Sequence, residues 1–142
     1  MNATTCLLLA LLMPAADPNE DAKKDLQKMQ GTWKVEKLTN NGTEAPAEII
    51  AKMSVVIAKN KMTVEAEGRP GEVAEVTLDP SKKPAHYDFT PANDSKQRHG
   101  LYKFDGEKLY LCWTRGGGER PKAFESKPDS MIVVFELKKE KK

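Results

Sequence analysis

Apolar and polar side chains alternate with a period of two through most of the chain after Thr32. This pattern is typical of half-buried β-strands, and turn residues such as Asn40-Asn41-Gly42 and Asp105-Gly106 separate the segments. The predicted strands are 32–39, 53–58, 62–67, 72–78, 85–90, 100–104, 108–114 and 131–137. Eight short strands with turns between them predict an all-β fold, an eight-stranded up-and-down antiparallel barrel. A two-sheet sandwich is the alternative.

One face of each predicted strand carries the large apolar side chains, and we expect this face to point into the barrel. In the first strand Lys37 is predicted to share that face with Trp33 and Val35. Because a barrel of eight strands can hold one small molecule, the inward residues are the candidate ligand-binding set. They are Val35, Val55, Ile57, Val64, Val76, Tyr87, Phe89, Tyr102, Phe104, Leu111, Trp113 and Phe135.

Two segments depart from the strand pattern and favour helix. Asp17 is suited to an N-cap, Pro18 to the first helical position and Glu20 to the third, so a helix is predicted over 18–30. Its narrow apolar stripe consists of Ala22, Leu26 and Met29. We expect this helix to close one end of the barrel or to lie against its wall. Helix-forming residues over 47–52 predict a short helical turn that caps the open end.

The first sixteen residues differ in composition from the rest of the chain. The apolar run 6–13 is followed by Pro14 and two alanines, which predicts a signal peptide cleaved near Ala16 and a secreted or periplasmic protein. Segment 17–30 is then the N-terminal helix, 31–139 the single barrel domain and 140–142 a charged tail. The mature chain holds Cys112 alone, so no intrachain disulfide is expected.

Charge and candidate chemistry narrow the functional classes. The chain has 23 Lys and Arg against 21 Asp and Glu, which is not the basic footprint of a nucleic-acid-binding protein. The leader is too short for stable membrane insertion. His86 and His99 are not at metal-ligand spacing, and no base is identified for Cys112. No catalytic residue, metal or cofactor is therefore predicted, and an enzyme ranks below a non-enzymatic protein.

The signature Gly31-Thr32-Trp33 at the head of the first strand resembles the G-x-W motif of the lipocalins and the wider calycin superfamily. Over 26–139 the chain is similar to a family of small lipocalin-like domains abundant in planctomycete bacteria. The matching segments are 30–35, 78–84, 88–91, 100–102, 105–106, 109–112, 120–124 and 126–128. The resemblance implies the barrel and an exported setting, and it supplies no activity. It also implies that Arg120 contacts Trp33 in a cation–π pair, with Gly31 as the third signature residue.

Two functional hypotheses follow. The first is an exported lipocalin-like barrel that binds a small hydrophobic ligand in its interior. The second is a non-enzymatic structural or protein-interaction domain whose barrel is filled by its own side chains. The free volume inside the barrel separates the two hypotheses. Large residues fill it (Trp113, Tyr87 and Phe89), whereas small ones leave space (Ala66 and Ala74). The identity of the ligand, the oligomeric state and any protein partner stay open.

Overall fold

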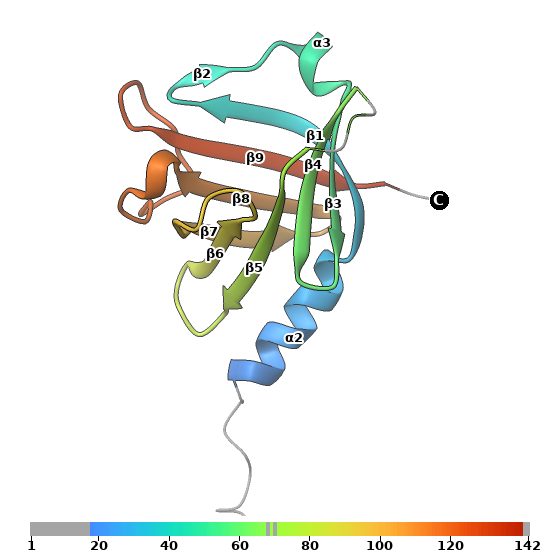
Figure 1. Ribbon diagram of the computed structural model, residues 1–142, viewed down its shortest axis with the longest axis vertical. Coiled ribbons are helices and arrows are strands. Elements are labelled where there is room, and N and C mark those ends of the chain that lie inside the picture. Colours follow the sequence, from blue (N-terminus) through green and yellow to red (C-terminus); the bar gives the residue numbers. More distant parts are fainter. Residues whose placement is uncertain (1–17, 68, 70, 141–142) are drawn as a thin grey trace, which may run out of the picture.

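The computed structural model describes residues 18–67, 69 and 71–140. This part of the chain contains nine antiparallel strands. From β3 to β9 each strand pairs with the next one in the sequence, and β1 pairs with both β2 and β3. The sheet closes because β1 also pairs with β9 (Figure 1). β2 lies beyond this ring, so eight strands form the barrel itself. The predicted eight-stranded antiparallel barrel with an N-terminal helix is thereby confirmed.

The strand bounds agree with the alternating pattern to within a few residues. The strands are β1 (Gly31–Asn40), β2 (Thr43–Glu44), β3 (Met53–Ala58), β4 (Lys61–Ala66), β5 (Val73–Asp79), β6 (Ala85–Pro91), β7 (Arg98–Asp105), β8 (Lys108–Thr114) and β9 (Ile132–Lys139). The helices are α2 (Pro18–Met29), α3 (Ala47–Ile50) and the short 3₁₀ helix η1 (Arg115–Gly117). Both predicted helical segments are therefore present.

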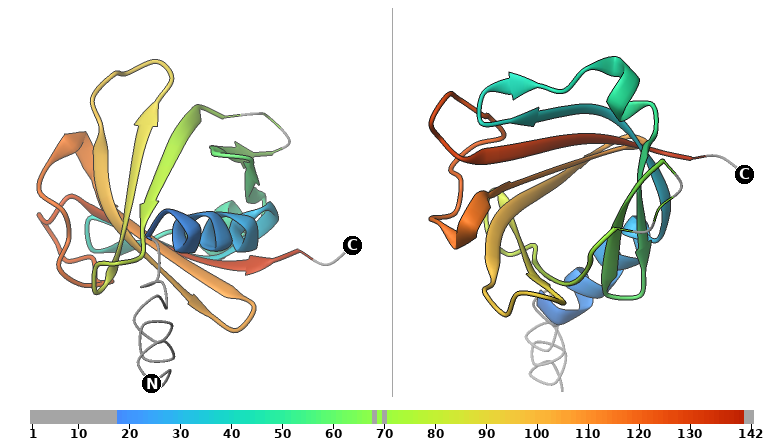
Figure 2. Two further views of the ribbon diagram at one scale, coloured as in Figure 1. Left: turned by 90° about the horizontal axis from the view of Figure 1, so that it is seen from below. Right: turned by 45° about the horizontal axis from the view of Figure 1, so that its top comes forward.

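Helix α2 lies across one end of the barrel, and we call this the closed end (Figure 2). Ala22 and Leu26 pack against the core and Met29 is fully buried, so the predicted apolar stripe faces the barrel. Gly31 has φ +115 where the chain turns from α2 into β1, a conformation that other residues rarely adopt. The predicted N-cap Asp17 lies outside the described residues.

The prediction that Lys37 shares the inner face of the first strand is wrong. The register of β1 against β9 shifts between Val35 and Lys37, which is the effect of a β-bulge. One extra residue reverses the alternation, so Lys37 is exposed and Leu38 packs against the core. The bulge lies on the strand that closes the barrel, where a local bend is common.

The end of the barrel away from α2 is open, and we call it the mouth. The β1–β2 turn lies at this end, with φ +52 at Asn41 and φ +82 at Gly42, as the sequence predicts for a tight hairpin. Helix α3 follows and contacts β1 and β3. The mouth is further bordered by the β4–β5, β6–β7 and β8–β9 connections.

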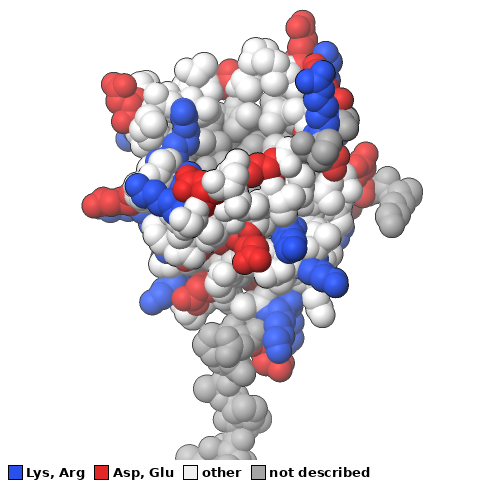
Figure 3. All heavy atoms as spheres, in the orientation of Figure 1, with Lys and Arg blue, Asp and Glu red and all other residues white. Residues whose placement is uncertain are grey.

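Acidic and basic side chains are interspersed on the face of the molecule shown in Figure 3, in keeping with the small net charge of +2. None of the helices in 18–67, 69 and 71–140 combines the length and the apolar character needed to cross a membrane. The predicted signal peptide, residues 1–16, lies outside the described residues.

Candidate functional site

The twelve side chains predicted to point inward all lie in the hydrophobic core of the barrel. Nine of them are buried, and the other three, Val64, Phe104 and Trp113, are partly buried and pack against the rest. Alternation along each strand places them there, because only one face of a barrel strand meets the interior. Their role as ligand contacts remains a prediction.

Aromatic rings fill the middle of the barrel. The Phe89 ring lies edge-on to Trp113 with centroids 5.2 Å apart, and Trp113 is 5.3 Å from Phe135. Tyr87 extends the cluster to Phe89 at 5.4 Å. These separations are those of packed aromatic pairs. The buried Tyr87 hydroxyl donates to the Met62 sulfur at 3.0 Å, and burial raises the pKa of this tyrosine well above its usual value.

Open space begins on the mouth side of this cluster, in a cavity of about 340 Å³. Its wall is mostly apolar, and charged side chains stand at its rim. The lining residues are Met62, Val64, Glu72, Ala74, Phe89, Pro91, Arg98, Trp113, Arg115 and Gly116. Val64, Phe89 and Trp113 belong to the predicted ligand-binding set, and Ala74 is the residue predicted to leave space in the interior. The other lining residues are not among those predicted.

The β4–β5 ladder along the wall of this cavity is short. Their ladder runs only from Lys61, paired with Glu75, to Thr63, paired with Val73. Beyond this point β4 continues to Ala66 without a ladder partner in β5, and Gly71, just before β5, lies close against the Val64 carbonyl oxygen. Val64, on this part of β4, lines the mouth cavity.

Arg98 is the charged residue set most deeply in the mouth. It pairs with Phe89 in the β6–β7 ladder, which places it on the inner face of β7. Only 15% of its side chain is exposed, and its guanidinium donates to the Asp94 carboxylate at 2.7 Å and to the Lys96 carbonyl oxygen at 2.6 Å. The hydrogen bond from Arg98 is the largest cause of the lowered pKa of Asp94.

Arg115 follows β8, the strand that pairs with β7, and reaches the same cavity from this neighbouring strand. Its guanidinium donates to the neutral side-chain oxygen of Asn40 at 3.3 Å. Among the described residues it has no ion-pair partner, and neither has Glu72, the acidic residue on the cavity wall. Arg115 thus brings a positive charge to the mouth that no carboxylate within this part of the chain neutralises.

The closed end has a different arrangement. Trp33 is only 2% exposed, as expected for a residue that fills this end, and Lys139 lies 5.5 Å above its ring. Lys28 lies over Phe104 at 5.4 Å, and the two pairs border a cavity of about 570 Å³. The cation on Trp33 is therefore Lys139. The expectation that Arg120 stacks on Trp33 is wrong, because β9 continues alongside β1 and pairs Lys139 with Trp33.

Arg120 instead fastens a long segment to the outer face of the barrel. We call residues 115–131, between β8 and β9, the strap. Arg120 donates to the Asp88 carboxylate and to the Gly100 carbonyl oxygen, both at 2.7 Å. Further along the strap, the Ser126 hydroxyl donates to the Ile132 carbonyl oxygen and accepts from the Gly42 amide. The strap is therefore anchored at both ends.

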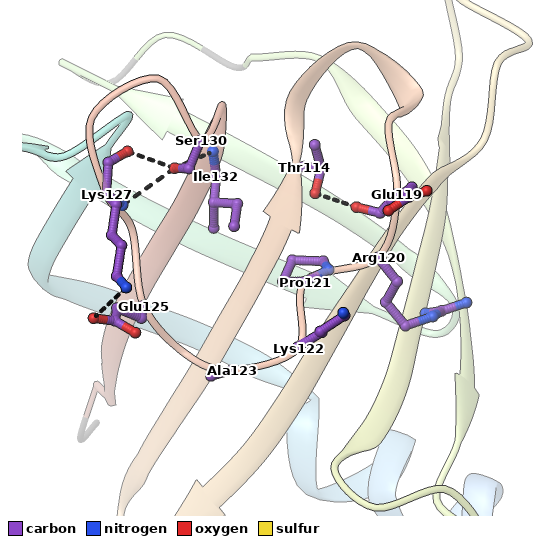
Figure 4. A pocket seen from close by; sticks show the side chains of 10 residues that line it. All are labelled: Thr114, Glu119, Arg120, Pro121, Lys122, Ala123, Glu125, Lys127, Ser130 and Ile132. Carbon is purple, nitrogen blue, oxygen red and sulfur yellow. Dashed lines mark hydrogen bonds and ion pairs between the residues drawn. The ribbon is translucent and has the colours of Figure 1, made fainter.

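The strap covers a second, smaller apolar layer. Pro121 is buried, and Leu101 and Cys112 below it are buried on the outer face, where they pair in the β7–β8 ladder. Burial raises the pKa of the Cys112 thiol to about 12, and this cysteine packs as a small hydrophobic residue. Figure 4 shows the open pocket of about 430 Å³ between the strap and the neighbouring strands, with Arg120 turned toward the β6–β7 side.

The two histidines lie beside the strap anchor on the outer face. His99 Nδ1 is 3.2 Å from the Asp88 carboxylate, which Arg120 also contacts. Partial burial lowers the pKa of His86, and the nearby Arg120 charge acts in the same direction. No cluster of three or more metal-ligating side chains is found in 18–67, 69 and 71–140. The Asp88 carboxylate thus holds His99 and Arg120 together and fixes the strap to the outer face.

Comparison of the chain with protein-family models, with curated proteins and with solved structures finds no match. The candidate site therefore rests on geometry, and the mouth cavity is the strongest one. It combines an apolar floor with a small number of polar groups, which is the usual composition of a small-molecule site.

Proposed function

We propose that this protein is an exported lipocalin-like barrel that binds one small hydrophobic molecule in its mouth. The observation that carries the proposal is the cavity of about 340 Å³ above the Phe89–Trp113 pair. This volume is at the lower end of the roughly 300–1,000 Å³ typical of ligand pockets. The ligand is therefore expected to be compact.

The position of the cavity restricts the ligand to one half of the barrel. Tyr87 and Phe135 both contact the Trp113 ring, so a ligand that went deeper along this wall would have to displace packed side chains, which is costly. The contacts proposed for it are the floor formed by Phe89 and Trp113 and the walls formed by Met62, Val64 and Ala74. The deeper residues of the predicted set then serve as core.

The alternative is a structural or protein-interaction domain with a filled barrel. The packed aromatic cluster and the anchored strap favour it, because both would stabilise a scaffold equally well. We rank it second because the interior is not filled as far as the mouth. In either case the proposed role is non-enzymatic, and it requires no cofactor.

A neutral fluorescent probe tests the binding proposal. N-phenyl-1-naphthylamine should bind at micromolar concentration, and its emission should be excited through Trp113, which lines the cavity. Ala74→Leu, which fills cavity space on β5, should weaken binding at least several-fold. Ala58→Leu is the matched control, because Ala58 is exposed at the far end of β3. Absence of binding, or equal binding by both variants, would favour the filled scaffold.

Export is tested separately. The proposal is that cleavage near Ala16 leaves a mature chain that begins at Asp17, as the apolar run 6–13 and the small residues after it suggest. The intact mass of the protein recovered from its own cells, together with its distribution between cytoplasm and extracytoplasmic fractions, gives the answer. A cytoplasmic chain that still begins at Met1 would reject export and leave the binding proposal standing.

A further inference from the structure

The apolar walls of the mouth cavity explain binding of a hydrophobic body, but they do not explain why two arginines line it. Arg98 has only 15% of its side chain exposed, and a partly desolvated cation is unfavourable unless an anion compensates for it. Arg115 is exposed at the rim, where its charge is available to a ligand. This inference rests on the proposed function. We propose that the mouth selects amphiphilic carboxylates. The apolar tail lies above Phe89 and Trp113, and the single negative headgroup lies between Arg98 and Arg115.

Arg98 is held in place before any ligand arrives. Its inner-face position is fixed by the ladder with Phe89, and the loop before β7 supplies the Asp94 carboxylate and the Lys96 carbonyl oxygen as acceptors. A guanidinium has five N–H donors, and these two contacts leave others for a further acceptor. Binding of a ligand carboxylate as a second anionic partner of Arg98 therefore costs little conformational entropy, because the arginine does not have to change position.

Arg115 supplies the charge that is not neutralised. Its contact with Asn40 is to a neutral oxygen and is long, at 3.3 Å, so a charged acceptor would compete with it effectively. The alternation that turns Leu111 and Trp113 inward brings Arg115 to the same inner side at the end of β8. A headgroup above Trp113 would thus lie next to this guanidinium.

Glu72 limits the charge of the ligand. It is the acidic residue among those lining the cavity and lies at the start of β5. With Arg98 matched by Asp94, the positive charge left for a ligand is that of Arg115, and Glu72 would repel a second negative group. These charges favour one acidic headgroup over a phosphate ester or a dicarboxylate.

Two probes with the same aromatic skeleton isolate this charge. 1-Anilinonaphthalene-8-sulfonate is N-phenyl-1-naphthylamine with one added sulfonate. We expect the wild-type protein to bind the sulfonate more tightly than the neutral probe. Arg115→Gln should weaken sulfonate binding about tenfold, the loss typical of a charge-assisted contact, and leave the neutral probe within about twofold. Arg69→Gln, which removes the same charge from an exposed turn, should change neither.

Competition identifies the headgroup class. Decanoate should displace the sulfonate probe at lower concentration than decanol does, and Arg115→Gln should remove the difference. Arg98→Gln should act in the same direction, with urea unfolding used to confirm that the variant is folded. Equal affinity for charged and neutral competitors, or no effect of Arg115→Gln, would overturn the carboxylate assignment while leaving hydrophobic binding intact. Failure of every probe to bind would overturn both proposals.

Discussion

The indole nitrogen of Trp33 donates a hydrogen bond of 2.8 Å to the carbonyl oxygen of Met29. Met29 is the last residue of α2, and the final carbonyls of a helix have no partner within it. Trp33 therefore joins the helix to the first strand across Gly31 and fills the closed end at the same time. One side chain thus connects the N-terminal helix with the barrel core.

Replacement of Trp33 by alanine should lower the free energy of unfolding by about 3–5 kcal/mol, because a buried aromatic side chain and its hydrogen bond are both lost. Trp33→Phe should be milder, since it keeps most of the packing. Urea unfolding followed by circular dichroism measures both. Val73→Ala, at a position 38% exposed, is the control. A change below about 1 kcal/mol for Trp33→Ala would contradict the closing role.

Gly100 should tolerate no side chain. A Cβ there would lie 2.1 Å from the Cys112 carbonyl oxygen and 3.0 Å from Trp113 Cβ, so Gly100→Ala would force β7 and β8 apart. We expect a loss of about 1–3 kcal/mol, the usual cost of overpacking a core site. Gly106→Ala is the comparison, because nothing lies within 4 Å of that position although its φ is +59. Equal losses at the two sites would show that β7 and β8 can separate freely.

The Arg120–Asp88 pair should have a measurable coupling energy. Both side chains are 23% exposed, so the pair is better protected from solvent than a surface ion pair. A double-mutant cycle with Arg120→Gln and Asp88→Asn should give a coupling of about 1–2 kcal/mol. The exposed Lys52–Glu67 pair, treated in the same way, should give a smaller value. No excess over that control would mean that Arg120 does not anchor the strap.

Cys112 should make stability fall at alkaline pH. Its pKa is about 12 in the fold against an ordinary value of 9.0, so both states hold the proton below about pH 9. Between pH 9 and 12 the unfolded chain loses the proton and the folded chain keeps it. Stability should therefore decline as pH rises, by up to about 1.4 kcal/mol per pH unit.

The Cys112→Ala variant should lack this part of the decline. The buried Tyr87 and Tyr102, whose pKa values are also raised, add to it only above about pH 10. In the native protein, iodoacetamide should modify Cys112 slowly at pH 8, as shown by peptide mass spectrometry, which also distinguishes it from Cys6. Rapid native labelling, or an unchanged slope in the variant, would contradict a closed strap.

The sequence predicts the barrel well because one face of each strand meets the apolar interior and the other face is mostly exposed to solvent. The alternation of apolar and polar residues follows directly from this difference. The twelve predicted inward residues lie in the core for that reason. Lys37 fails the rule because a bulge inserts one residue into β1. The predicted strand 100–104 begins after Arg98, and only the pairing of Arg98 with Phe89 shows that this residue points inward.

The strap could not be predicted from periodicity, because single side chains position its irregular backbone. Arg120 lies in a segment that the family resemblance marks as important, yet the resemblance assigned it to Trp33, and the fold assigns it to Asp88. Likewise the mouth cavity is lined by residues from β4 to β8, and which of them lie side by side is decided by the strand pairing. Residues brought together from separate strands carry no local signal.

The pairing of β1 with β9 also affects when the chain can fold during its synthesis. Trp33 pairs with Lys139, so the ring of strands cannot close until synthesis has passed through the entire sheet. Contacts this distant in sequence make folding slow, and until they form, β1 and β8 each present an unpaired edge. A nascent chain of this topology can therefore complete its barrel only after β9 has been synthesised.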